Sequence, residues 1–224
     1  FQDGVFIPAA SYPDVFKDTW LDQYNSNANH GGNGSLVVGD SPHSPSSSAN
    51  TLIEINLSSI PIRNPYEVVN ATLSLYKMGG GGSEAVNISI SPLLPIWSES
   101  TASWNSRNST ANWQTGGARG SLDSSFPADM LTTSDNGWYT WDISHAMQVA
   151  HVIGLDTVKF VLQGEGLVID WHEFASSEYT GDISYRPALN VTWRNGNAWL
   201  PSDASGLNPA HQQTLWDYTA QRPS

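Results

Sequence analysis

Residues 16–32, FKDTWLDQYNSNANHGG, place oxygen-bearing side chains at spacings that could bind a cation. Three asparagines stand at alternate positions: Asn25, Asn27 and Asn29. An EF-type calcium loop ends on a bidentate glutamate at its twelfth position, where this stretch has Leu36, so such a loop is disfavoured. Two interpretations remain. The asparagines form Asx turns with nearby backbone, or a structural calcium ion is held by Asp18, Asp22 or Glu178.

Residues 168–178, VIDWHEFASSE, form the densest group of ionisable side chains. Successive side chains of a strand alternate between its two faces, so Asp170 and His172 are predicted to share one face. A histidine beside a carboxylate could bind a metal, act in acid–base chemistry or contact a ligand. The alternative is a solvated strand face. Glu178 has an alternative structural role, an ion pair with Arg186 across the closing hairpin.

Aromatic side chains are a second source of candidate sites, because the chain has ten Trp and eight Tyr. Such rings offer an apolar face and a polar tip, which suits stacking on a sugar ring. The ligand candidates have polar neighbours, which predict half-exposed positions: Trp20, Tyr24 and Trp171, with His172 beside the last. Four further tryptophans are predicted to lie in the core: Trp104, Trp113, Trp138 and Trp141.

Catalysis has less support in the sequence. A glycosidase needs two carboxylates at a defined separation, and the 21 acidic residues reveal no such pair by themselves. A nucleophile elbow of the G-x-S-x-G type does not occur. No catalytic residue is therefore nominated, and an enzyme acting on polysaccharide is the weakest of the function classes considered.

The charge balance narrows the possible partners. The chain of 224 residues has a net charge of −12, and only 13% of its residues are charged. Nucleic acids and anionic lipids need a basic surface, so neither is an expected partner. There is no cysteine, which rules out disulfides and thiolate metal sites. No apolar run approaches the roughly 20 residues of a membrane helix, so no membrane insertion is expected.

Six N-x-S/T sequons indicate a glycosylated, exported protein at the cell surface or outside the cell. Their asparagines are Asn33, Asn56, Asn70, Asn87, Asn108 and Asn190.

Strands must position most of these candidate residues. Apolar residues alternate with polar ones in several segments: TLIEINL (51–57), NATLSLYK (70–77), AVNISIS (85–91) and ALNVTW (188–193). Period two with one apolar face predicts half-buried antiparallel strands. One short helix is predicted in DISHAMQVAHVIG (142–154), with Ser144 as N-cap and Gly154 as its C-terminal stop. The sequence therefore predicts an all-β fold, an antiparallel β-sandwich or jelly roll with its first and last strands adjacent.

The strand pattern ends near Arg194, which divides the chain into a jelly-roll module at 1–194 and a C-terminal tail or linker at 195–224. The tail contains six large apolar side chains: Trp199, Leu200, Leu207, Leu215, Trp216 and Tyr218. Ordering each residue costs about 1–2 kcal/mol of backbone entropy, so these side chains must be buried if the tail is ordered. They would dock on their own domain or on an identical subunit.

Ten short segments over about residues 1–194 resemble one known family. They are FQDGV, DTWLDQYNSNANHG, LVVG, INLSSIP, NATLSLY, WSESTASWN, WQTGG, GWYTWDIS, FASSE and RPALNVTW, in the family's order. The family is the DNRLRE-type domain, also called the disaggregatase-related repeat, which is grouped with family-96 carbohydrate-binding modules. The name-giving string is replaced here by SANTLIE (48–54).

The resemblance implies a jelly-roll sandwich on secreted or cell-surface proteins of archaea and bacteria, often beside polysaccharide-degrading domains. Some members resemble alginate binders that use basic residues. This chain departs from them, since its basic residues are few and scattered: Lys17, Lys77, Arg107, Arg119 and Lys159 among others. The expected function is a non-catalytic extracellular module that binds a polysaccharide or glycan. The alternative is a structural subunit of a cell-surface layer or filament, with its tail docked on a neighbour.

Overall fold

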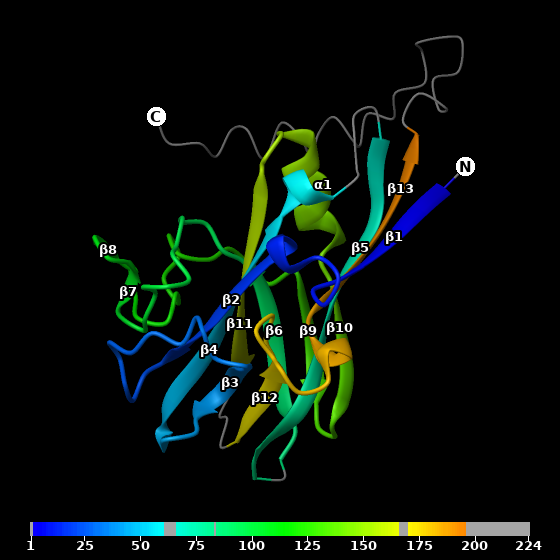
Figure 1. Ribbon diagram of the computed structural model, residues 1–224. Helices are drawn as coiled ribbons and strands as arrows, with labels where there is room; N and C mark the ends of the chain where they lie inside the picture. The colour runs from blue at the N-terminus through cyan, green and yellow to red at the C-terminus, as the bar shows by residue number, and fades with distance from the viewer. Residues whose placement is uncertain (1, 61–65, 83, 166–169, 196–224) are drawn as a thin grey trace.

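The computed structural model describes residues 2–60, 66–82, 84–165 and 170–195 (Figure 1). Eleven strands of this part form one antiparallel sheet: β1 (Gln2–Pro8), β2 (Phe16–Asp22), β3 (Ser35–Ser41), β4 (Ser44–Asn56), β5 (Tyr66–Gly81), β6 (Val86–Pro92), β9 (Asp129–Thr133), β10 (Gly137–Asp142), β11 (Thr157–Glu165), β12 (Trp171–Ala175) and β13 (Ala188–Asn195). A second sheet pairs β7 (Ser106–Asn108) with β8 (Ala111–Asn112). The helix α1 spans Ser144–Val152, and three 3-10 turns lie at η1 (Pro13–Val15), η2 (Leu57–Ser59) and η3 (Ile183–Tyr185).

The large sheet curls around its own core. Its main path runs β1-β13-β5-β12-β3-β4-β11-β6-β9, while β10 pairs with β5 and β2 pairs with β4. The chain turns back after β9 into β10, which pairs with β5. β9 and β10 therefore lie close together where the sheet curls round, and the Asp142 amide of β10 donates to Asp129 Oδ2 of β9 at 2.8 Å. The result is a half-barrel that encloses one core, which confirms the predicted all-β sandwich class.

The alternating pattern correctly predicted the side chains that face this core. Buried residues of the segments named above are Ile53 and Ile55 on β4, Ala71, Leu73 and Leu75 on β5, Val86, Ile88 and Ile90 on β6, and Leu189, Val191 and Trp193 on β13. Phe160 of β11 and Phe174 of β12 complete the centre. Burial of large apolar side chains contributes about 1.5–3 kcal/mol each, so this alternation is the main source of the fold's stability.

A second core lies on the outer side of β2, β4 and β11. Residues 93–125 cross this side and bury their own tryptophans against three strand residues, Leu21, Leu52 and Val161. The covering tryptophans are Trp97, Trp104 and Trp113. Two of the four predicted core tryptophans, Trp104 and Trp113, are therefore buried by a loop rather than within the main sandwich.

The predicted helix is present, but its first turn differs from the expectation. The N-cap is Ile143, without a side-chain hydrogen bond, and not Ser144. The Ser144 hydroxyl instead accepts from the Ala71 amide at 2.9 Å, which fixes the helix to β5. Gly154 has φ 68, the left-handed conformation that ends helices, as predicted. The helix covers one end of the curled sheet (Figure 1).

The first and last strands of the described chain are adjacent, as the sequence predicted. β1 pairs with β13 along its whole length, from Gln2 opposite Arg194 to Pro8 opposite Ala188. Residues 196–224, which hold most of the predicted tail, lie outside the described residues. Within the described part, none of the helices is long and apolar enough to cross a membrane.

We expect Val191→Asp to lower the free energy of unfolding by about 3 kcal/mol, because it buries an unpaired charge in the main core. Val191 is fully buried on β13, between β1 and β5. For a domain of this size the loss corresponds to a fall in Tm of about 6–12 °C. The control is Asn190→Asp, which adds the same charge one residue earlier on the exposed face. Equal Tm values for the two variants would contradict the assigned strand orientation.

Candidate functional site

The N-terminal stretch 16–32 is anchored by a buried aspartate. The carboxylate of Asp22 accepts from the Tyr24 amide at 3.0 Å, the Asn25 side chain at 2.8 Å and the Ser41 hydroxyl at 2.7 Å. These contacts form an Asx-type turn at the end of β2. Asp22, one of the predicted metal ligands, thus already has donors on both oxygens, which leaves it poorly suited to an ion.

The remaining asparagines of this stretch make both local and longer-range contacts. Asn29 Oδ1 accepts from the Gly31 amide at 3.3 Å, the predicted Asx-type contact with nearby backbone. Asn29 donates to the carbonyls of Glu99 at 2.6 Å and Ala102 at 2.8 Å. The Asn27 side chain accepts from Asn105 at 3.0 Å. They hold the loop after β2 against the covering segment 93–125, a contact that spacing along the chain cannot reveal.

The aromatic candidates near β2 have different exposures. Trp20 is only 4% exposed, so the expectation of a half-exposed ring was wrong, because the His30 ring stacks on it at 3.9 Å between centroids. Trp171 is half-buried and packs against the cluster formed by Trp20, Val37 and Ala49. Tyr24 is exposed beside His43, 6.0 Å away. Of these predicted ligand residues, Tyr24 alone presents a largely free ring.

Asp18, the second predicted metal ligand, lies in a group of carboxylates. Its Oδ2 accepts from the Ser177 amide at 2.9 Å, and its own amide donates to Glu99 Oε1 at 2.9 Å. Burial, then the nearby charge of Glu178, raise the pKa of Asp18 well above its usual range. Glu178 does not pair with Arg186 as one alternative predicted, since the Arg186 guanidinium donates to the Tyr179 carbonyl at 2.8 Å. In the part of the chain that is described, no three acidic or imidazole side chains already surround a common point.

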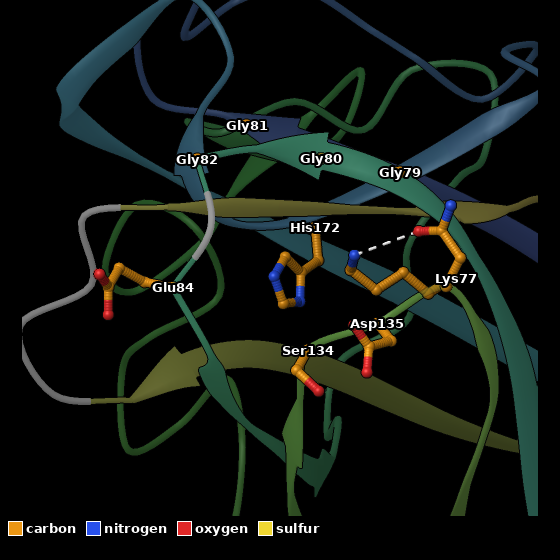
Figure 2. A pocket seen from close by; sticks show the side chains of 10 residues that line it. Lys77, Gly79, Gly80, Gly81, Gly82, Glu84, Ser134, Asp135 and His172 are labelled. Carbon is orange, nitrogen blue, oxygen red and sulfur yellow. Dashed lines mark hydrogen bonds between the residues drawn. The ribbon is translucent and has the colours of Figure 1, made fainter.

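The fourth ligand candidate, His172, lines a hollow of about 460 Å³ at the end of the sheet opposite α1. Figure 2 shows Lys77 reaching toward His172 beneath the glycine segment 79–82, with Ser134 and Asp135 on the other side. The Lys77 ammonium donates to Asn136 at 3.3 Å, and the carboxylate of Glu84 points away (Figure 2). These groups can hydrogen-bond a small polar ligand.

The buried environment of His172 keeps its imidazole neutral. Burial first and the Lys77 charge second lower the pKa of His172 to about 4, against weaker opposing effects of the Glu84 backbone and Asp170. The ring Nδ1 lies 2.6 Å from the Thr133 hydroxyl. His172 and Asp170 are both buried, so the alternative of a solvated strand face was wrong.

An aromatic surface that the sequence did not predict lies on the outer side of β5 and β10. Trp138 is 46% exposed and meets Tyr76 edge to face at 5.5 Å, so its assignment to the core was wrong. Tyr76 in turn stacks on Tyr185 of η3 at 3.8 Å and 9°. Trp138 and Trp141 are three residues apart on one strand, which places them on opposite faces. Only Trp141 faces the core, where it is fully buried.

Polar side chains continue this outer surface along the two strands. Thr140 follows Trp138 on the same face of β10, opposite Ser74 of β5, and the two hydroxyls lie 2.8 Å apart. Asn136, on the rim of the hollow, precedes Trp138 by two residues. The turn before β10 therefore connects the aromatic surface to the hollow.

A comparison with protein-family models matches residues 9–193 to carbohydrate-binding module family 96. The match spans most of the chain and the whole curled sheet except β1 and the last two residues of β13. The chain belongs to this family. The comparison with curated proteins gave no match.

Membership of family 96 makes the chain a carbohydrate-binding module. The structure shows which of its surfaces suit a carbohydrate. The two features suited to sugars are the aromatic surface of Tyr76, Trp138 and Tyr185 and the polar hollow beside His172. The hollow is lined by His172, one of the predicted ligand residues, whereas none of the three aromatic residues was among them.

The sequon asparagines of the module all reach the surface. Asn33, Asn70, Asn87 and Asn190 are exposed, and Asn56 and Asn108 are partly exposed. Asn56 also accepts from the Ser58 amide at 3.0 Å, at the start of η2. Surface position permits glycosylation, and modification of these residues stays a prediction.

The low pKa of His172 predicts a specific dependence of stability on pH. The unfolded chain has a histidine pKa near 6.5 and takes up a proton before the folded protein, whose pKa is about 4. The stabilisation is complete above pH 6.5 and is lost as the pH falls from 6.5 to 4, by about 3 kcal/mol in total. Urea unfolding across this range should show the loss.

The matched variants are His172→Gln, which removes the titrating group, and His145→Gln on the exposed side of α1. We expect His172→Gln to flatten the curve between pH 6.5 and 4 and His145→Gln to leave the wild-type slope. The same slope in all three proteins would contradict a neutral, buried His172.

Proposed function

We propose that this family-96 module is a non-catalytic extracellular protein domain that binds a neutral glycan chain on the outer surface of β5 and β10. The observation that supports it is the exposed Trp138 ring, held edge to face by Tyr76, which itself stacks on Tyr185. The three rings come from β10, β5 and η3, so the folded sheet fixes their positions before a ligand arrives.

Preorganised aromatic rings suit a sugar because a pyranose has an apolar face of C–H groups and a rim of hydroxyls. The face packs on an indole ring, and the rim needs hydrogen-bonding partners. The hydroxyls of Ser74 and Thr140 lie on the same side of the sheet as Trp138 and can provide such partners. Rigid rings lose little conformational entropy on binding, which favours affinity.

The charges around this surface favour a neutral glycan over a polyanion. Trp138 shares the outer face of β10 with Asp142, while Lys77 is buried on the inner side of β5. The net charge of −12 adds a general repulsion for polyanions. Uronate-rich chains should therefore bind less well than neutral ones.

The extracellular, non-catalytic part of the proposal rests on family membership and on the surface positions of the six sequons. An enzyme of the glycosidase kind needs two carboxylates that flank a ligand. In the hollow beside His172, the Glu84 carboxylate points away from the other lining side chains (Figure 2), which favours binding without catalysis. The structural-subunit alternative depends on residues 196–224, which are outside the described residues.

A glycan array followed by calorimetry on the best neutral ligand tests the proposal. We expect Trp138→Ala and Tyr185→Ala each to weaken binding about tenfold or more, because a stacked ring contributes about 1–2 kcal/mol. The control is Phe126→Ala, since Phe126 is 94% exposed and directly follows the covering segment, outside this surface. Its affinity and the Tm of all three variants should match the wild type.

The same experiment separates this surface from the hollow. Wild-type affinity in Trp138→Ala together with a large loss in Asn136→Ala would place the glycan in the hollow and contradict the proposed surface. Turnover of any bound polysaccharide by the wild type would contradict the non-catalytic assignment.

A further inference from the structure

Asp18 carries an unsatisfied buried oxygen. The residue is 1% exposed, and its Oδ1 has no hydrogen-bond partner while Oδ2 accepts from the Ser177 amide. A buried polar atom without a partner costs free energy, and a carboxylate oxygen costs more than a neutral one. Native structures generally place a water, an ion or a proton at such an atom. The buried Oδ1 of Asp18 therefore needs a water, an ion or a proton as its partner.

Two further carboxylates from distant segments lie beside it. Glu178 adjoins Ser177, and its Oε2 is also buried without a partner, while its Oε1 accepts from the Ser177 hydroxyl at 2.8 Å. Glu99, from the covering segment, accepts from the Asp18 amide at 2.9 Å. Like charges close to one another repel, so these carboxylates are stabilised by a nearby positive charge or by a proton.

Neighbouring cations are directed elsewhere. Lys17, on the opposite face of β2, pairs with Glu54 at 3.1 Å. Arg186 donates to the Tyr179 carbonyl at 2.8 Å, next to Glu178 in sequence but away from its carboxylate. Neither of these basic residues is therefore paired with Asp18 or Glu178.

We propose that Asp18, Glu178 and Glu99 form a calcium site, with the ion between Asp18 Oδ1 and Glu178 Oε2. The donors are all oxygen, which suits a hard cation, and Ca²⁺ accepts irregular geometry and completes its shell with water. Asp18 is fixed on β2, whereas Glu99 and Glu178 lie in loops. Binding of the ion therefore requires the side chains of Glu99 and Glu178 to move toward Asp18.

The ion adds to the hydrogen bonds by which Asp18 already joins three parts of the fold. It links β2, the covering segment near Glu99 and the turn after β12 near Glu178. The same place receives the loop after β2, since a Cβ on Gly31 would lie 2.2 Å from the Glu99 carbonyl. In a chain without cysteine, such a link takes the place of a covalent crosslink.

The competing explanation is a proton shared by Asp18 and Glu178, which would also satisfy the buried oxygens. The two explanations differ in their response to calcium. We expect 2 mM CaCl₂ to raise the Tm of the EDTA-treated full chain by about 5–10 °C at pH 7, as saturating binding to the folded state alone requires. The same ionic strength of NaCl should raise it far less, and calorimetry should find about one Ca²⁺ per chain.

The variants are Asp18→Asn and Glu178→Gln, which keep the side-chain shapes and remove the charges. Both should remove the calcium-dependent shift in Tm while remaining folded in EDTA, because they also remove the repulsion. The control is Asp14→Asn, an exposed acid near β2, which should keep the full shift.

A wild-type Tm that is the same in calcium and in EDTA would overturn the proposal and support the shared proton. A calcium-dependent shift that survives in Asp18→Asn would also overturn it, since the ion would then bind elsewhere. Neither result bears on the glycan surface, because Trp138 and Tyr185 belong to other strands.

Discussion

The conformations of the loops in this molecule are fixed by buried carboxylates that accept hydrogen bonds from backbone amides. Asp123 holds the covering segment by accepting from the amides of Gln114, Thr115 and Gly120 at 2.8–3.0 Å. Asp22 does the same at the end of β2. Such charge-assisted bonds contribute about 1.5–3 kcal/mol each and fix a loop at a defined place. The chain has no disulfides, so the long connections of the fold depend on these hydrogen bonds. Asp18 differs from Asp22 and Asp123 because one of its carboxylate oxygens has no hydrogen-bond partner.

The covering of the sheet explains where a ligand can bind. The outer side of β2, β4 and β11 is closed by residues 93–125 with their buried tryptophans. The outer side of β5 and β10 is not covered in the same way and presents Trp138 among hydroxyl groups. Aromatic residues thus serve two purposes in one chain. Those of the covering segment stabilise the fold, and those of β5, β10 and η3 are available for recognition.

Much of the fold followed from local pattern, whereas the site did not. Alternation identified the core-facing residues of four strands because period two is a property of any strand with one buried face. The same rule, applied to the three-residue spacing of Trp138 and Trp141, would have placed Trp138 outside the core. The stacking of Trp20 on His30 depends on how the loop after β2 folds back, and the approach of Glu99 to Asp18 joins segments far apart in sequence. Spacing carries no information on such contacts, so they could not be predicted.

The pairing of β1 with β13 determines how the module responds to a mechanical load. The strands are antiparallel, and the start of β1 lies beside the end of β13 (Figure 1). A stretching force applied through both ends would pull on the ladder from one end and open its hydrogen bonds one after another. Parallel terminal strands would instead share such a force over all their bonds at once. The module is therefore built to yield first at this edge under tension, while the remaining strands and the aromatic surface stay in place.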